Sequence, residues 1–297
     1  MAAKPFKILM TGATGFLGSN LLRKFLAEKR DVCLLVRSAS NYSRIKDLVP
    51  KLKLFSIDEI SLERFFKAEK IDVILHCATN YGRKMEPPVS VLQANLLLPL
   101  RLLQIGAEHG LNCFINSDTI LDKRVSHYSL SKSQFREWLN LYSDRVVCGN
   151  VALEHFYGPG DDNSKFVTLM IQSLLRGVPS IGLTPGEQKR DFIHISDVVN
   201  AFSTVVEWLK RKKAGFYNFE IGTGSTISIR DFMCLLKELT GNTVTKLDFG
   251  AFPYRENEVM ESNVDLSLIR AAGWRPKMPL ARGLRGAILS EKERILK

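Results

Sequence analysis

One stretch decides how the first part of this chain folds: Thr11-Gly12-Ala13-Thr14-Gly15-Phe16-Leu17-Gly18. It follows the apolar run FKILMT and opens an amphipathic segment, which predicts a helix over 16–29. Glycines at these positions permit a tight turn, a close approach of a phosphate to the backbone, and close packing of the helix. The helix N-terminus adds free amides and a positive potential. We therefore predict a dinucleotide pyrophosphate site made by Gly12, Thr14, Gly15, Phe16, Leu17 and Gly18.

Short apolar runs alternate with amphipathic segments through the first half of the chain. The runs are continuous, as in VCLLVR, DVILHCA and VVCGNVAL, which is typical of strands buried on both faces of a parallel sheet. Segments long enough for crossover helices lie between them. This order predicts an α/β fold with a doubly wound parallel sheet of the Rossmann type over residues 1–155.

The pattern changes after Ala152, where Gly- and Pro-rich segments such as YGPGDD and GVPSIGLTPGEQ appear. Loops of this kind often carry specificity residues on a rigid scaffold. We therefore predict a smaller C-terminal α/β domain over 156–297 that binds a substrate, with part of 190–215 returning to the first domain. Its helices are expected at 165–176, 196–210, 229–239 and 279–296.

Composition limits the partners and the location that we expect. The 297 residues are 45% hydrophobic, enough for a large core, and carry a net charge of +11. Lys and Arg are dispersed, so a cleft for a diphosphate explains the charge and no nucleic-acid partner is expected. Apolar stretches fall short of the roughly 18 residues that span a bilayer, and the five cysteines lack CxxC spacing. We expect a cytoplasmic protein with reduced cysteines, no metal and no membrane partner.

A tyrosine and a lysine four residues apart, Tyr128 and Lys132, form a candidate catalytic pair. This spacing places both side chains on one face of a helix. The ammonium is expected to lower the pKa of the phenol, which could then exchange a proton near neutrality, and to hold a nicotinamide ribose. Tyr42 and Lys46 repeat the spacing but follow the second strand, at the adenine end of such a cofactor. Position therefore favours Tyr128 and Lys132.

The residues after the second strand bear on the choice of cofactor. NAD sites usually carry an acidic residue at this strand end, where it binds the ribose 2′-hydroxyl. Here Val36 takes that place and Arg37 and Ser38 follow. A guanidinium and a hydroxyl would accept a 2′-phosphate, which a carboxylate would repel. We predict NADPH or NADP+ bound by Arg37 and Ser38; the alternative is NAD, with Arg37 a solvated loop residue.

The form TGATGFLG, followed by Tyr128 and Lys132 after the fifth strand, resembles the extended short-chain dehydrogenase/reductases, the NAD-dependent epimerase/dehydratase family. The resemblance implies a catalytic hydroxyl at the end of the fifth strand. Ser117 supplies it, with Thr119 as the substitute because the gap from Ser117 to Tyr128 is unusually short. Members of the family often dimerise through two helices, so a homodimer is expected. Four further cofactor contacts are implied: Asp58 at the adenine, and Ala78, Thr79 and Asn95 along the ribose and nicotinamide.

The second half resembles one subgroup, the CDP-abequose and CDP-paratose synthases, which reduce the 4-keto group of a CDP-linked 3,6-dideoxyhexose. The similar segments are ALEHFYGPGD, GEQKRDFI, RENE and AGWRP. In this subgroup Arg190 and Arg255 would hold the diphosphate; an ion pair for Arg190 and a polar core role for His155 are the alternatives. The implied substrate contacts are Asn80, Asp118, Thr119, His155, Lys165, Phe166, Arg190, Arg255 and Glu258.

The family's dehydratases carry Thr-Asp-Glu where this chain has Ser117-Asp118-Thr119, so dehydration is disfavoured. We predict reduction of the C4 ketone of a nucleotide-linked 4-keto-deoxyhexose by NADPH, with Tyr128 as the acid, Ser117 orienting the oxygen and Lys132 tuning Tyr128. A 4-epimerase with permanently held NAD+ is the first alternative. A non-catalytic cofactor-binding protein on the same fold is the second.

Overall fold

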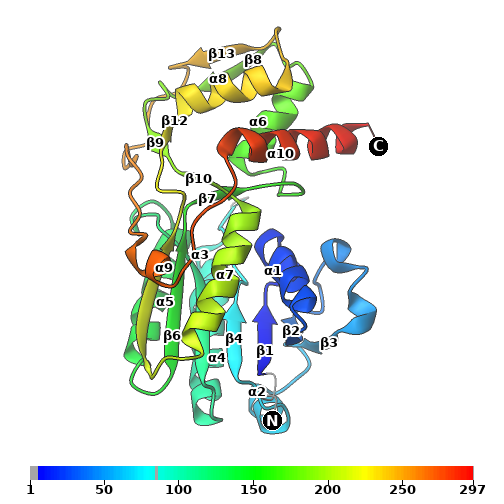
Figure 1. Cartoon of the computed structure of the whole chain (residues 1–297), viewed down its shortest axis with the longest axis vertical. Coiled ribbons are helices and arrows are strands. Elements are labelled where there is room, and N and C mark those ends of the chain that lie inside the picture. The colour runs from blue at the N-terminus through cyan, green and yellow to red at the C-terminus, as the bar shows by residue number, and fades with distance from the viewer. Residues whose placement is uncertain (1–5, 84–85, 297) are drawn as a thin grey trace.

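The structure is a computed structural model that describes residues 6–83 and 86–296. Its centre is a seven-stranded sheet in the order β11-β6-β5-β4-β1-β2-β3, and every neighbouring pair is parallel (Figure 1). The chain moves outward from β1 to β3 and then outward again on the other side from β4, which is the doubly wound order. The predicted fold class is confirmed. The strands are β1 (Lys7–Thr11), β2 (Asp31–Val36), β3 (Lys53–Ser56), β4 (Val73–His76), β5 (Cys113–Thr119), β6 (Val147–Leu153) and β11 (Gly215–Ile221).

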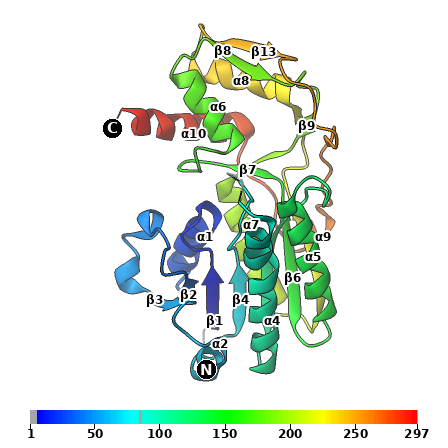
Figure 2. The same ribbon diagram turned by 180° about the vertical axis from the view of Figure 1, so that it is seen from behind.

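Both faces of this sheet are covered by helices, which explains why its strands are continuous apolar runs. Ile8, Leu9 and Met10 follow one another in β1, point to alternate faces, and are all fully buried. One face carries α1 (Phe16–Ala27) and α7 (Ile195–Leu209), seen in Figure 1. The other carries α2 (Leu62–Ala68), α4 (Leu98–Glu108) and α5 (His127–Leu141), seen from behind in Figure 2.

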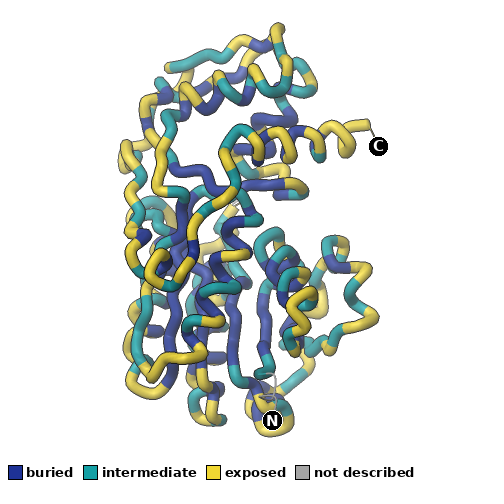
Figure 3. Tube along the Cα trace, in the orientation of Figure 1, coloured by how far each residue is buried: buried dark blue, intermediate teal, exposed yellow. Residues whose placement is uncertain are grey.

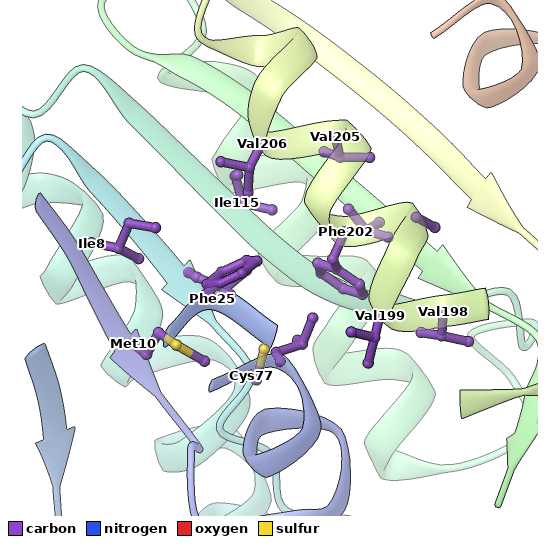
Figure 4. Close-up of a cluster of buried hydrophobic side chains, with 14 of the residues drawn as sticks. Ile8, Met10, Phe25, Cys77, Ile115, Val198, Val199, Phe202, Val205 and Val206 are labelled. Atoms are coloured by element: carbon purple, nitrogen blue, oxygen red, sulfur yellow. The ribbon is translucent and has the colours of Figure 1, made fainter. Parts of the chain in front are cut away.

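The core between α1, α7 and the sheet shows how close this packing is. Phe25 of α1 and Phe202 of α7 lie beside Ile8 and Met10 of β1, and all four side chains are fully buried (Figure 4). Burial traced along the backbone is concentrated in the strands and in the inner sides of these helices (Figure 3). A rigid scaffold of this kind fixes where the strand ends project.

The residues after β6 build a second lobe above the carboxyl ends of the strands (Figure 1). Three small sheets pair β7 (His155–Tyr157) with β10 (Phe192–His194), β8 (Ser180–Leu183) with β13 (Lys246–Phe249), and β9 (Lys189–Arg190) with β12 (Ile227–Ser228). Helices α6 (Phe166–Leu175), α8 (Ile229–Thr240) and α10 (Leu280–Ile295) complete the lobe around its own core. Between these segments, α7 and β11 return to the large sheet.

The remaining elements are short, and one run of them bears on the membrane prediction. They are η1 (Ser43–Ile45), η2 (Val49–Lys51), α3 (Pro88–Leu92), η3 (Gln93–Leu97) and α9 (Ser267–Ala271). With α4, α3 and η3 form one helical run, Pro88–Glu108, of 21 residues and mean hydropathy 1.3, long and apolar enough to cross a membrane. This corrects the expectation that no stretch reaches that length. One such helix is weak evidence for a span, and Leu102 and Leu103 in it are buried against the sheet.

Candidate active site

The glycine loop has the shape that a dinucleotide needs. Gly12 has φ +69°, and a Cβ there would lie 2.4 Å from the backbone nitrogen of Ala78. A Cβ at Gly18 would lie 2.1 Å from the carbonyl oxygen of Gly12, so only glycine lets α1 start this close to the loop. Gly15 is the N-cap of α1 and brings no side chain, which leaves the first amides of the helix available to an anion.

The other predicted loop residues line the same edge. Thr14 and Leu17 are half-buried, and Leu17 packs on the core beneath α1. The ring of Phe16 stacks on that of Phe156 in β7, with centroids 6.1 Å apart and planes 4° from parallel. The loop thus contacts the second lobe, and the cofactor end of the cleft is built from both halves of the chain.

Helix α5 presents the predicted Tyr-Lys pair. Ser126 caps the helix by accepting from the Ser129 amide, and the Ser129 hydroxyl returns to Ser126, so α5 begins at His127. Lys132 follows Tyr128 by one turn and is only 1% exposed. Its Nζ has no hydrogen-bond partner among the residues that the structure describes, and burial lowers the pKa of Lys132. A buried ammonium without an acceptor is unfavourable, so a ribose hydroxyl of a dinucleotide fits this position.

The environment of Tyr128 differs from the sequence-based expectation. Burial raises the pKa of Tyr128 well above its ordinary value, and Tyr81 and Asp118 raise it further. The sequence predicts that Lys132 lowers this pKa, but loss of solvent around the phenol dominates. The phenol is therefore held in its protonated form, the state in which it can act as an acid.

Two hydroxyls end β5, and they face different partners. Thr119 lies close enough to Tyr128 to act on its pKa through hydrogen bonding. Ser117 lies two residues deeper in the strand, and its hydroxyl interacts with the Cys77 thiol. Of the two candidates for the catalytic hydroxyl, Thr119 is thus the one whose interaction with the phenol is indicated.

Asp118, which was predicted to contact the substrate, is bonded to protein groups in this structure. One carboxylate oxygen accepts from Arg136 Nε at 2.6 Å and from Asn150 Nδ2 at 2.9 Å, and the other accepts from the Thr119 amide at 2.7 Å. The carboxylate is fully buried. A buried carboxylate with both oxygens bonded fixes the backbone at the end of β5, and through it Thr119.

Asn95, which was predicted to line the cofactor, likewise bonds to protein groups that hold a loop. It lies in η3 and is fully buried; its Oδ1 accepts from the Asn80 amide at 2.7 Å and from the Thr79 hydroxyl at 3.2 Å. Its Nδ2 donates to the Asn80 carbonyl and to the Ser131 hydroxyl of α5. Asn95 thus ties the loop after β4 to α5. The backbone of Ala78, earlier in that loop, lies against Gly12 of the glycine loop; its contact with a cofactor stays a prediction.

The residues predicted to bind the adenine end of the cofactor differ in their surroundings. Arg37 is exposed at the end of β2. The Ser38 amide donates to Asp58 Oδ2 at 2.7 Å, and the Ser38 hydroxyl donates to Glu59 Oε1 at 3.1 Å. The hydroxyl expected to meet a 2′-phosphate therefore contacts a carboxylate, which repels phosphate. The Asp58 carboxylate accepts a hydrogen bond from the Ser38 backbone amide.

In the second lobe, Arg190 forms an ion pair, which was the alternative to a diphosphate contact. Its guanidinium forms an ion pair with Glu258 and donates to the carbonyls of Lys189 at 2.7 Å and Val259 at 2.6 Å. Burial lowers the pKa of Arg190. Through these bonds Arg190 and Glu258 hold the segment that carries Arg255. The Arg255 side chain is exposed and accessible to a diphosphate. The diphosphate contact predicted for Arg190 stays a prediction.

His155 lies at the cleft with a carboxylate behind it. Its Nδ1 is 2.9 Å from Oε2 of Glu154, whose side chain is fully buried and whose other oxygen accepts from Ser262. With Nδ1 taken by Glu154, Nε2 is the nitrogen that remains for a ligand. Sequence reasoning missed Glu154, although the Glu-His pair was in the segment singled out.

A pocket of about 550 Å³ opens beside Tyr128. Tyr81 lines it and was also missed, although it directly follows the predicted Asn80. Lys165 places Nζ 3.8 Å from the centre of the Tyr81 ring, and Phe166 begins α6 beside it, about one-third exposed. The pocket is lined by Tyr81, Gly82, Lys123, Arg124, Val125, Ser126, His127, Tyr128 and Leu130.

The fold and the glycine loop define a dinucleotide-binding protein of the doubly wound class. Residues 8–222 match the model of the NAD dependent epimerase/dehydratase family. The CDP-abequose synthase of Salmonella muenchen is 32% identical over 97% of this chain and 98% of that protein, and that of Salmonella typhimurium is 30% identical over 93% and 95%. The chain therefore belongs to the NAD dependent epimerase/dehydratase family, which confirms the predicted family.

A solved structure agrees with this fold. The UDP-glucose 4-epimerase of Thermotoga maritima, crystallised with UDP-glucose, superposes with a TM-score of 0.83 at 23% identity, over 98% of this chain and 100% of that one. At this identity the likeness concerns the fold alone.

Proposed function

We propose that the protein reduces the C4 ketone of a nucleotide-linked 4-keto-deoxyhexose, with CDP as the nucleotide and NADPH as the hydride source. The observation that carries the proposal is the placement of Tyr128 one helical turn from the buried Lys132 on α5, with Tyr128 lining an open pocket. The similarity to CDP-abequose synthases over nearly the whole chain supports the substrate class. Exposed Arg37 supports NADPH, and Arg255 and the imidazole of His155 are proposed contacts for the substrate.

The chemistry divides simply between cofactor and chain. The bound nicotinamide supplies the hydride. Tyr128 gives its proton to the alkoxide that develops at the sugar oxygen, and its raised pKa keeps that proton in place until the oxygen becomes basic. Thr119 orients the same oxygen by hydrogen bonding, and Asp118 holds Thr119 by accepting from its amide. Lys132 holds the ribose.

Matched pairs of variants test these roles on a CDP-linked 4-keto sugar with NADPH. Tyr128→Phe is expected to lower kcat by about a hundredfold or more while NADPH binding persists; Tyr42→Phe, in the second Tyr-Lys pair, serves as the control. Thr119→Ala is expected to cost much more kcat than Ser117→Ala. Full activity of Tyr128→Phe would refute the mechanism, and the reverse order for the hydroxyls would return that role to Ser117.

A 4-epimerase with permanently held NAD+ is the second candidate, favoured by the carboxylates of Asp58 and Glu59 around Ser38. An epimerase regenerates its cofactor in each cycle. Protein that carries NAD+ as purified and interconverts C4 epimers without added cofactor would establish it. Consumption of NADPH in stoichiometric amounts with the ketone would establish the reductase.

We also propose a cytoplasmic homodimer that pairs through α3, η3 and α5. Exposed apolar side chains gather on these elements: Val89, Leu97, Trp138 and Leu141 are 62%, 50%, 43% and 69% exposed. An apolar surface of this kind marks an interface. Trp138→Glu is expected to convert a dimer to monomers in light scattering; a wild-type monomer would refute the proposal.

A further inference from the structure

Tyr81 lies between the proposed proton donor and the second lobe. It belongs to the loop between β4 and α3, and its ring centre is 4.9 Å from that of Tyr128, with the planes tilted by 43°. Lys165, the N-cap of α6, places Nζ 3.8 Å from the Tyr81 ring, and the Arg83 guanidinium lies 5.0 Å from it. Cations over the ring face are attracted to it. The Tyr81 ring thus contacts both lobes.

Hydrogen bonds fix the loop that carries Tyr81 on both sides. The residue before it, Asn80, is held through its backbone by Asn95, and Asn80 Oδ1 accepts from the Gly82 amide at 2.8 Å. Gly82 has φ +63°, a conformation that suits glycine, so the turn after Tyr81 is set by sequence. Asn95 also reaches Ser131 of α5. The loop and the helix that carries Tyr128 are therefore one connected unit.

Two cations join the loop to the second lobe: Arg83 of the loop and Lys165 of the second lobe. Arg83 Nη1 donates to the Ser164 hydroxyl at 2.5 Å, and Lys165 follows Ser164 directly. The pocket of about 550 Å³ beside Tyr128 is open, and Tyr81 is part of its wall. A tyrosine in a first helical turn beside an open pocket can change its side-chain rotamer unless another group restrains its ring. The Tyr81 ring, whose centre is 4.9 Å from that of Tyr128, is placed where it can supply that restraint.

We propose that Tyr81 is a positioning residue: its ring holds the Tyr128 phenol in the orientation for proton transfer and, through Lys165, makes that orientation depend on the second lobe. The inference rests on the proposed function, because Tyr128 must be the proton donor for its position to affect turnover. It assigns to the Tyr81 ring, and not to its hydroxyl, the contact that matters.

The test compares Tyr81→Leu, Tyr81→Phe and Tyr217→Leu in the full chain. Tyr217 is a matched control, since its ring also packs on an aromatic, Trp208 at 5.2 Å, but lies on β11 away from the cleft. Tyr81→Leu is expected to lower kcat about tenfold to a hundredfold, the effect of a misplaced catalytic group, with NADPH affinity retained. Tyr81→Phe is expected to restore most of that loss, and Tyr217→Leu to leave kcat unchanged.

A pH profile separates positioning from a general structural effect. Tyr81 and Arg83 from the loop and Asp118 and Thr119 from β5 influence the pKa of Tyr128. The titratable side chains Lys123, Arg124 and His127 line the same pocket. Removing the Tyr81 ring changes the solvation of the phenol, so Tyr81→Leu is expected to shift the alkaline limb of kcat. The proposal is overturned if Tyr81→Leu keeps the wild-type kcat. It is also overturned if Tyr81→Leu loses kcat while its pH profile is unshifted and its NADPH binding is weakened to the same degree.

Two further measurements complete the design. A double-mutant cycle with Lys165→Gln should show that the two losses of kcat are not independent, because both act through one contact; strict additivity would contradict the link to the second lobe. A pH titration followed by phenolate absorbance measures the ionisation of Tyr128 without turnover. The contribution of Tyr128 is the difference between Tyr81→Leu alone and Tyr81→Leu combined with Tyr128→Phe. If wild type reduces no 4-keto sugar, the proposed function fails, whereas an unshifted phenolate titration rejects the role of Tyr81 alone.

Discussion

Asp161 offers a test of the electrostatics of the second lobe. It lies in the loop between β7 and α6, is 2% exposed, and accepts from the Asp162 amide at 2.7 Å. Burial raises the pKa of Asp161 from 3.8 to about 6, although Lys165 and Arg44 act in the opposite direction. Keeping the Asp161 carboxylate charged in the folded protein therefore lowers the free energy of unfolding. We predict that Asp161→Asn, which can keep the same hydrogen bond, stabilises the protein at neutral pH.

The magnitude and its pH dependence follow from the two pKa values. One pKa unit corresponds to about 1.4 kcal/mol, so the penalty is at most about 3 kcal/mol at neutral pH. The folded side chain keeps its proton to higher pH than the unfolded one, so wild-type stability from this group falls as pH rises from about 4 to about 6 and is constant above. Asparagine has no such dependence. Asp161→Asn should therefore gain about 1–3 kcal/mol above about pH 6.5 and nothing below about pH 4.

Urea denaturation of wild type and Asp161→Asn at several pH values measures this difference. The neighbouring Asp162 provides a control of opposite sign, because hydrogen bonds from Ser164 lower the pKa of Asp162. Asp162→Asn should lose stability at neutral pH, and the loss should shrink in acid. An Asp161→Asn variant that is no more stable than wild type at neutral pH, or whose gain persists at about pH 3, would refute the reasoning.

Three further predictions use the same kind of measurement. Gly18→Ala should lower the free energy of unfolding by about 1–3 kcal/mol or more and abolish NADPH binding, because its Cβ would lie 2.1 Å from a carbonyl oxygen; Gly286→Ala, with open space around it, is the control in denaturation and fluorescence titration. Arg190→Gln should lower the melting temperature, since its guanidinium joins a carboxylate and two carbonyls, whereas Arg255→Gln should mainly raise the substrate KM. Lys132→Met should stabilise the free protein and reduce the thermal shift that NADPH produces, because the buried ammonium has no partner among the described residues.

Features that depend on neighbours along the chain were predictable from the sequence. Apolar runs and helical periodicity established the doubly wound sheet, since each strand and helix follows from a local pattern. The glycine loop was equally clear, because Gly12 and Gly18 stand directly between a strand and a helix. The position of the Tyr-Lys pair followed from its place after the fifth strand, and not from its spacing, which Tyr42 and Lys46 share.

Features that depend on distant contacts were not predictable. Ser117 and Thr119 are both hydroxyls on one side of β5, and which one meets Tyr128 depends on how far the strand continues before α5 begins. An arginine in a segment that resembles a substrate-binding motif can hold a ligand or another loop with the same donors. For Arg190 the answer comes from Glu258, 68 residues further along the chain, and sequence spacing carries no information on that contact.

Some of the unfavourable features of this fold lie at the carboxyl edge of the sheet. Lys132 buries an ammonium there, and His76 in β4 and Asn116 in β5 have a buried Nε2 and Oδ1 without partners among the described residues. The Asp118 carboxylate near them, by contrast, has both oxygens bonded. In doubly wound folds ligands bind outside the carboxyl ends of the strands. Groups that cost stability in the free protein at that edge are the ones that a ligand can satisfy, so binding free energy and the local loss of stability have the same structural origin.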